Sequence, residues 1–274
     1  MRNSFKTIVH PTDFSDASAD AFAHALRVVL ATRGKLYLVH VAESDFFDDG
    51  FPHVRYTLAL WKLMNENDSP AAIGKLGIKV AKIGLEPEAP LRGLLRFLDE
   101  HPSDLIVLAT HGRDGVAHWL QGSIAEELSR RVQVPTLFIP PNARGFVDQR
   151  NGKLHLSRVL VPVDHSPPSA GAIATIRDFI RTMNELDATI ELMHVGENGP
   201  LIRNIDDDAV VPVALRTDDV VSAILDAAKE MQADLIAMPT AGHHGFLDAL
   251  RGSTTERVLR HSTCPVLAVP ATLD

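Results

Sequence analysis

The chain has 274 residues, of which 45% are hydrophobic and 23% are charged, a composition typical of a folded globular protein. Its formal net charge of -8 argues against a protein that binds nucleic acid or an anionic membrane, because such proteins present basic faces. No apolar run approaches the ~18 residues of a membrane span, and the single cysteine, Cys264, excludes a disulfide framework, so we expect a cytoplasmic protein with one buried thiol.

Apolar runs alternate with helical patterns along the first half of the chain. A strand that begins near Ile8 is ended by Pro11 and Asp13, and a helical pattern follows at 15–32. Further strands are expected at 36–41, 78–83, 104–109 and 134–140, and further helices at 89–101 and 123–132. Residues 43–76 make a longer excursion, which is expected to hold an extra helix at 56–64.

The second half repeats the order of the first. Its first strand begins near Leu160 and is ended by Pro162 and Asp164. Strands are expected at 190–195, 209–215, 234–239 and 264–270, and helices at 166–184, 218–232 and 253–260. Because the strands are continuous apolar runs between helices, they predict parallel sheets covered on both faces. The repetition predicts two tandem α/β domains, at 1–141 and 157–274, joined by a turn-rich linker at 142–156.

A glycine loop follows the fourth strand of each half and opens a helix. The loops contain Ala109, Thr110, Gly112, Gly122 and Ser123 in the first half, and Pro239, Gly242, Gly252 and Ser253 at the same spacing in the second. Such glycines let backbone N–H groups approach a ligand, and the N-terminus of the following helix favours an anion. No lysine precedes either serine, so this is not the GxxxxGK[ST] phosphate loop, and no GxGxxG follows the first strand of either half.

Each Gly-Ser pair also fits an ordinary helix start. Ser123 with Glu126, and Ser253 with Glu256, match the capping box, in which the two side chains satisfy each other's backbone N–H groups. Taken alone, either pair is better explained as a cap. The glycine spacing, which is kept in both halves, favours binding.

The acids at the ends of the first strands, Asp13 and Asp164, complete the pattern. If the first and fourth strands are neighbours, each acid converges with its glycine loop at the carboxyl end of the sheet, where ligands bind in open α/β folds. A carboxylate there can accept hydrogen bonds from a ribose or a base. The alternative, that each acid caps the next helix, is about as well supported by one acid alone.

Taken together, the PTDFS and PVDHS strand ends, the strands that close in His-Val and the two glycine loops resemble the universal stress protein family in its tandem two-domain form. The resemblance implies, in each domain, an open five-stranded parallel sheet with helices on both faces, of the Rossmann-like, adenine-nucleotide α-hydrolase-like kind, and a site for ATP with Mg2+. It places these residues around adenine and ribose: Pro11, Thr12, Asp13 and Val41 in the first half, and Pro162, Val163, Asp164 and Val195 in the second. It places these on the phosphates: Gly112, Gly122, Ser123 and Ile124, and then Gly242, Gly252, Ser253 and Thr254.

The sequence departs from the family motif, G-x2-G-x9-G-[ST], at its first glycine. Ala109 adds only a methyl group there, whereas Pro239 also removes an N–H and fixes φ. The second half also has Ala241 in place of His111 and Val163 in place of Thr12. We therefore hypothesise that the first site binds nucleotide more tightly.

The leading hypothesis for function is a regulatory stress-response protein that binds ATP and at most hydrolyses it slowly, because no nucleophile–base pair is visible. An alternative is an interaction protein that keeps the fold without nucleotide, which the two missing glycines favour. An enzyme that forms an adenylate or cleaves ATP is less favoured, because it would be expected to carry a glycine-serine loop directly after the first strand.

Other candidate residues have ordinary explanations, and no metal site is expected. His165, His243 and His244, and the run at 206–208, fit solvated loops better than metal ligands. His40 and His194, at strand ends, are expected to be packed or hydrogen-bonded. The family resemblance implies that the last strands of the two halves pair within the chain, and a homodimer is a further hypothesis.

Overall fold

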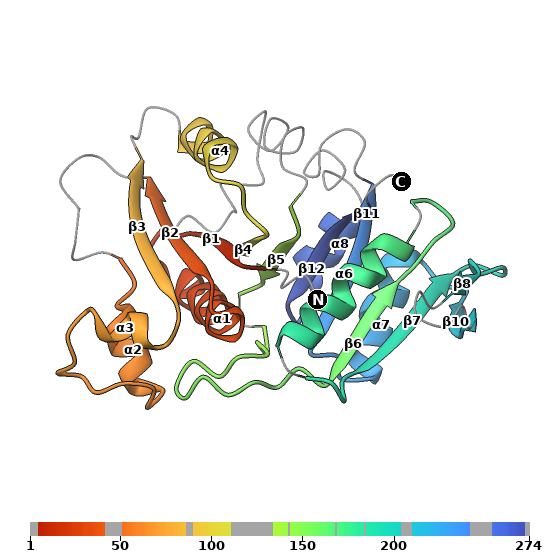
Figure 1. The fold of residues 1–274 in the computed structure, drawn as a ribbon. Helices are drawn as coiled ribbons and strands as arrows, with labels where there is room; N and C mark the ends of the chain where they lie inside the picture. The colour runs from red at the N-terminus through yellow and green to blue at the C-terminus, as the bar shows by residue number, and fades with distance from the viewer. Residues whose placement is uncertain are drawn as a thin grey trace.

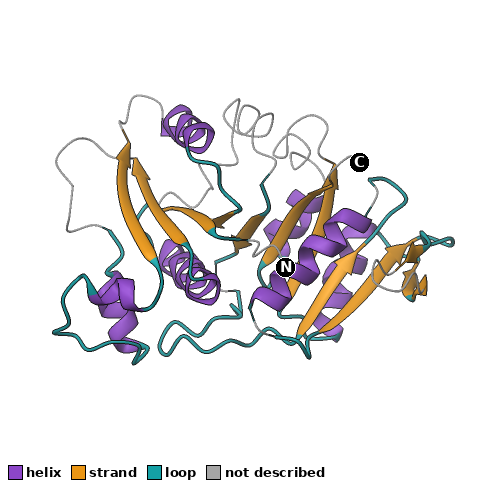
Figure 2. Cartoon of the chain, viewed as in Figure 1, coloured by secondary structure: helices purple, strands orange, loops and turns teal. Residues whose placement is uncertain are grey.

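A computed structural model describes residues 5–41, 51–85, 90–110, 134–141, 143–167, 169–183, 185–203, 210–241 and 254–271. Within these ranges one ten-stranded sheet runs through the molecule, with helices on both of its faces (Figures 1 and 2). Among the described helices, none is both long and apolar enough to cross a membrane.

The first half forms five parallel strands in the order β5-β4-β1-β2-β3. The strands are β1 (Thr7–Pro11), β2 (Lys35–Val41), β3 (Lys79–Leu85), β4 (Leu105–Ala109) and β5 (Thr136–Ile139), and the main helices are α1 (Asp16–Thr32) and α4 (Pro90–Glu100). All five predicted strands are present, whereas the predicted helix at 123–132 lies outside the described residues. The excursion holds α2 (Val54–Leu60) and α3 (Ala72–Lys75), so its helix begins and ends earlier than predicted.

The second half repeats this arrangement as β10-β7-β6-β11-β12, which confirms the tandem α/β fold. The strands are β6 (Arg158–Pro162), β7 (Thr189–Val195), β10 (Val213–Arg216), β11 (Leu235–Ala241) and β12 (Val266–Ala271), with helices α6 (Ala170–Thr182), α7 (Val220–Glu230) and α8 (Thr254–His261).

Two boundaries in the second half differ from the predictions. The third strand is divided, because Pro212 separates β10 from β9 (Val210–Val211), which pairs antiparallel with β8 (Ile202–Arg203). Helix α6 begins at Ala170 rather than at Ser166, since Pro167 restricts the residue before it and offers no N–H.

The two half-sheets are joined by β5 and β12, which lie side by side at the centre of Figure 1. They pair antiparallel, with Leu137 opposite Leu267 and Phe138 opposite Val266. Every other pairing within the ten-stranded sheet is parallel. The two halves therefore share one continuous sheet.

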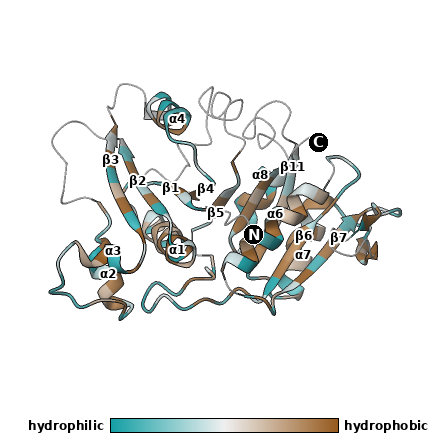
Figure 3. Cartoon of the chain, viewed as in Figure 1, coloured by the Kyte–Doolittle hydropathy of each residue, from teal (hydrophilic) through white to brown (hydrophobic). Residues whose placement is uncertain are grey.

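Apolar side chains fill both faces of this sheet, whose central strands are brown in Figure 3. Alternate residues of a strand point to opposite faces, so Ile8 packs on the side of α1 and α6, and Val9 on the side of α4 and α7. Phe146, from the predicted linker, is fully buried, with its ring centroid 4.6 Å from that of His24 and 6.3 Å from that of Phe179. Phe146, together with the buried Val147 and Leu156, thus anchors the predicted linker to the core.

Candidate functional site

In each half the first and fourth strands are neighbours, as the site prediction requires. β1 pairs with β4, and β6 pairs with β11. In the second half, α6 packs on one face of the sheet and α8 on the opposite face. The carboxyl ends of β6 and β11 therefore meet where the chain leaves to both sides, which is where open α/β sheets bind ligands.

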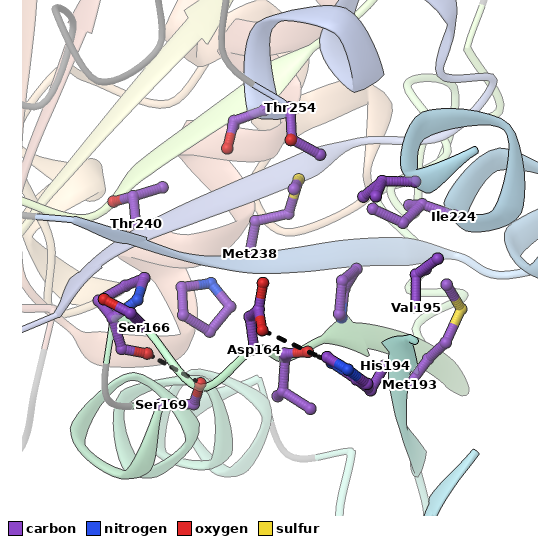
Figure 4. A pocket seen from close by; sticks show the side chains of 16 residues that line it. Asp164, Ser166, Ser169, Met193, His194, Val195, Ile224, Met238, Thr240 and Thr254 are labelled. Atoms are coloured by element: carbon purple, nitrogen blue, oxygen red, sulfur yellow. Dashed lines mark hydrogen bonds and ion pairs between the residues drawn. The ribbon is translucent and has the colours of Figure 1, made fainter. Parts of the chain in front are cut away.

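A cavity of about 230 Å³ opens at this point of the second half (Figure 4). Its apolar wall comes from β7, α7 and β11, and consists of Met193, Val195, Val220, Ile224 and Met238. Its polar side chains are those of Asp164, Ser166, Ser169, His194, Thr240, Thr254 and Thr255. One cavity thus brings together the predicted residues Pro162, Val163, Asp164, Val195, Pro239 and Thr254.

Asp164 lines this cavity and its carboxylate remains accessible, with a side chain 68% exposed. It accepts a hydrogen bond from the backbone N–H of His165 at 2.7 Å. The Nδ1 atom of His194 lies 3.7 Å from the carboxylate but 3.0 Å from the carbonyl oxygen of Val163. Only the shorter distance is that of a hydrogen bond, so we infer that the Nδ1–H group donates to the carbonyl oxygen of Val163. The carboxylate of Asp164 therefore keeps acceptor positions for a ligand.

The remaining polar groups lie at the ends of β11 and α8. Thr240 is buried and donates its hydroxyl to the carbonyl oxygen of Val269 at 3.2 Å. Thr254 is the first residue of α8, and Glu256, in the first turn, pairs with Arg260 at 2.6 Å. The N-terminal end of α8 therefore faces the cavity through Thr254, where its dipole favours an anion.

The end of β1 holds its polar groups differently. The hydroxyl of Thr12 is buried, and it accepts hydrogen bonds from the hydroxyl of Ser18 at 2.8 Å and from the backbone N–H of Phe14 at 3.2 Å. The carboxylate of Asp13 accepts from Ser15 twice, from the N–H at 3.0 Å and from the hydroxyl at 2.6 Å. Ser15 is itself the N-cap of α1. Asp13 is therefore hydrogen-bonded to the residue that caps α1.

Both strand-end histidines are hydrogen-bonded, as predicted. His40 approaches the carbonyl oxygen of Thr12 with its Nδ1 atom at 2.7 Å, as His194 does with Val163. The ring of Phe14 covers that of His40, with centroids 3.9 Å apart. In the second half His165 occupies the place of Phe14, and its ring lies 5.5 Å from that of His194.

One buried residue behind the first strand end was not singled out by its sequence. His10 is fully buried, with Nδ1 2.9 Å from the carbonyl oxygen of Val107 and Nε2 3.5 Å from the hydroxyl of Ser18. Burial lowers its pKa from 6.5 to about 4, so the ring is neutral near pH 7. A histidine inside an apolar run carries no sequence signal that separates core packing from ligand contact.

Several predicted site residues lie outside the described part of the chain. These are Gly112, Gly122, Ser123, Ile124, Gly242, Gly252 and Ser253, together with His243, His244 and the run at 206–208. Val41 ends β2, and Ala109 and Thr110 lie at the end of β4, where the N–H of Thr110 donates to the carbonyl oxygen of Ile139 at 3.0 Å. Across the described residues, no cluster of three potential ligands could hold a metal ion.

Cys264 is buried, as predicted. Burial raises the pKa of its thiol to about 11, so it is protonated and unreactive near neutral pH. Sequence reasoning missed several residues that line the cavity: the polar Ser166, Ser169, Thr240 and Thr255, and the apolar Met193, Val220, Ile224 and Met238. Nothing in their spacing separates a residue that lines a cavity from one that fills a core.

Comparisons with known proteins identify the family. The family model described as Universal stress protein family matches residues 4–140 and 201–270. A universal stress protein of Methanocaldococcus jannaschii is 29% identical over 147 residues, which cover 50% of this chain and 83% of that protein. Universal stress protein A homolog 1 of Coxiella burnetii is 28% identical over 144 residues, which cover 42% of this chain and 97% of that protein.

A solved structure shows the same two-domain fold. The universal stress protein of Archaeoglobus fulgidus DSM 4304 superposes with a TM-score of 0.57 at 19% identity, covering 96% of this chain and 95% of that one. The family model covers most of the chain in two segments, one in each half of the sheet. The chain therefore belongs to the universal stress protein family.

Proposed function

We propose that this protein is a regulatory stress-response protein that binds ATP and communicates its bound or empty state to a partner. The observation that carries this proposal is the cavity at the ends of β6, β7 and β11, which joins an apolar wall to the accessible carboxylate of Asp164 and to the start of α8. These three features suit the three parts of a nucleotide.

Each part of the cavity has a chemical counterpart in ATP. The apolar side chains of Val195, Ile224 and Met238 suit the faces of a purine. The carboxylate of Asp164 suits the hydroxyls of a ribose, because an ionised acceptor makes stronger hydrogen bonds than a neutral one. The dipole of α8, which begins at Thr254, suits the phosphates, and Mg2+ would be held chiefly by those phosphates.

The first half is proposed to hold a second and tighter site, because of the strand that precedes each glycine loop. Ile106 and Thr110 donate their N–H groups to β5, so the intervening Ala109 directs its own N–H away from β5, towards the side of β1. Pro239, at the corresponding place in β11, lines the cavity and has no N–H to offer. The first loop thus keeps one donor that the second lacks.

Binding without rapid turnover is the proposed activity. The Nδ1 atom of His194 is engaged by a backbone carbonyl, so that nitrogen does not serve as a base beside Asp164. We further propose that the pairing of β5 with β12 supplies the contact between domains within one chain, in a cytoplasmic protein that is free to form a homodimer.

Two measurements test the proposal. Purified protein is denatured and the released small molecules are identified by mass spectrometry, and the nucleotide-free protein is titrated with ATP and Mg2+ by calorimetry. We expect adenine nucleotide in the first measurement and two binding events in the second. Ile224→Trp, which fills the second cavity, is expected to remove the weaker event, whereas Leu186→Trp, at an exposed position, leaves both.

The opposite result favours the alternative function. A protein that releases no nucleotide and gives no heat with ATP would be an interaction protein that keeps the fold without a ligand. Loss of both events in Ile224→Trp, with an unchanged melting temperature, would contradict separate sites in the two halves.

A further inference from the structure

The excursion between β2 and β3 is firmly anchored to the rest of the molecule. Val54 and Leu58 of α2 are buried, and Trp61, 6% exposed, donates its ring N–H to the carbonyl oxygen of Gln149 at 2.8 Å. The Trp61 ring also packs on Gly152, where φ is +69° and a Cβ atom would lie 2.5 Å from Cδ2. The surfaces that α2 presents are therefore fixed in place.

A groove lies between this anchored segment and the outermost strand of the first half. We call it the β3–α2 groove; it has a volume of about 680 Å³ and is lined chiefly by Val54, Arg55, Tyr56, Ile73, Val80 and Lys82. It is larger than the nucleotide cavity, at about 230 Å³, and it is remote from the carboxyl ends of β6 and β11. Figure 1 shows α2 and α3 together beside β3, at the outer end of the sheet.

The groove combines apolar and basic side chains. Val54 and Val80 provide apolar surface, and Tyr56 is 61% exposed. Residues 51–85 contain five lysines and arginines against two acids, which gives +3 in a chain whose net charge is -8. Arg55 donates to the backbone carbonyl oxygen of Asp68 at 3.3 Å, and the Asp68 carboxylate accepts from the N–H of Asn65 at 2.9 Å. The local charge thus favours an acidic ligand.

The groove also borders an open sheet edge. β3 stands at the end of the strand order and pairs with β2 alone among the described strands. The N–H of Lys79 donates to the carbonyl oxygen of Gly34 at 3.0 Å, on the β2 side. Because the direction alternates along a strand, Val80 and Lys82 direct their backbone N–H and C=O groups outwards. Such an edge can accept a further strand.

We propose that the β3–α2 groove binds an acidic, extended segment of a partner protein, which adds to the outer edge of β3 and places apolar side chains in the groove. The edge supplies backbone hydrogen bonds, the apolar lining accepts alternate side chains of the segment, and Arg55 pairs with its carboxylates. The groove shares no lining residue with the cavity of the second half, and the proposal does not require ATP binding.

The first test uses random 12-residue peptides displayed on phage and selected on the full chain. We expect the enriched peptides to be rich in Asp and Glu alternating with apolar residues. Fluorescence anisotropy of a labelled enriched peptide is expected to show at least tenfold weaker binding to Arg55→Glu. Lys229→Glu, with the same charge change on α7 of the second half, is expected to bind like the unchanged protein. Equal binding by both variants, or no acidic enrichment, would overturn the proposal.

The second test separates charge from strand addition at one position. Lys82→Ala removes the ammonium group and keeps the outward N–H, whereas Lys82→Pro removes both and leaves the N–H groups that pair with β2 intact. We expect Lys82→Pro to bind the peptide at least fivefold more weakly than Lys82→Ala, with unchanged nucleotide affinity in both. Equal peptide affinities in two variants that melt at similar temperatures would overturn the strand addition.

Discussion

The ends of β1 and β6 share three of five residues, including the acid, yet the acid has different partners in the two halves. In the first half Asp13 accepts from Ser15, the residue that caps α1, and α1 begins at Asp16. In the second half α6 does not begin until Ala170, and the carboxylate of Asp164 is left open to the cavity. The position of the next helix decides whether the acid is hydrogen-bonded to the helix cap or stays accessible at the cavity.

This difference separates two properties that the shared motif suggests together. A capping network stabilises the fold, because it satisfies N–H groups that a helix start leaves without partners. An accessible carboxylate contributes little to stability but is available for binding. We therefore expect Asp13→Ala to act chiefly on the melting temperature and Asp164→Ala to act chiefly on the affinity for ATP.

The largest effect is expected from the buried histidine behind β1. His10 occupies the place that Val161 fills in the second half, and both residues are fully buried. Above about pH 6.5 the ring is neutral in both the folded and the unfolded state. Between pH 6.5 and its folded pKa of about 4, only the unfolded chain binds the proton. Acidification therefore favours unfolding, by about 1.4 kcal/mol per pH unit.

His10→Val removes this source of acid sensitivity. Urea unfolding at pH 7.5 and at pH 4.5 is expected to show that the loss of stability between the two values shrinks by about 2–3 kcal/mol. His155→Asn, at an exposed position, serves as the control and is expected to leave that loss unchanged. An equal loss in His10→Val and in the unchanged protein would mean that His10 is protonated in the folded state.

The next effect concerns the two acids themselves. Asp164→Ala is expected to weaken ATP binding at the second site by roughly tenfold to a hundredfold, because a hydrogen bond to a charged group is worth about 1.5–3 kcal/mol. Asp13→Ala is expected to lower the melting temperature more, and the ATP affinity less, than Asp164→Ala does. Calorimetric titration and thermal unfolding measure both quantities. The reverse pattern would show that Asp13 leaves its Ser15 partner when nucleotide binds.

A smaller effect is expected at the helix starts. Ser15 accepts from the N–H of Ser18 at 3.2 Å, whereas Ser169, at the N-cap of α6, makes no such side-chain bond. Ser15→Ala is expected to cost about 1 kcal/mol of unfolding free energy. Ser169→Ala is expected to change it by less than about 0.5 kcal/mol. Equal costs in denaturant titrations would argue against the difference between the two caps.

The strands and most helices follow from the sequence, because apolar runs bounded by turn residues specify a parallel α/β sheet. The neighbouring positions of β1 and β4, and of β6 and β11, follow from the same pattern once the fold class is known. The division of the third strand does not, since two-residue strands such as β8 and β9 have no periodicity.

The sequence also could not predict that Asp13 is hydrogen-bonded to the cap residue of α1 while Asp164 stays accessible. The hydrogen-bond partner of each carboxylate depends on where the next helix begins, and Pro167 moves the start of α6 to Ala170. The apolar wall of the cavity is hidden for a related reason. Ile224 lies on the core-facing side of α7 and Val220 is an exposed residue at its start, and sequence spacing does not show that both border a cavity.

The smallest effect is expected where the glycine motif departs from the family pattern. Pro239→Ala gives β11 the donor that Ala109 supplies in β4. One neutral hydrogen bond contributes about 0.5–1.5 kcal/mol. We expect a twofold to tenfold gain in the affinity of the weaker site for ATP, and a matching loss in the tighter site of Ala109→Pro. Calorimetry of Pro239→Ala is expected to show a smaller difference between the ATP affinities of the two halves. Calorimetry of Ala109→Pro is expected to show the matching loss, and an unchanged affinity of the first site would contradict a role for this N–H in binding.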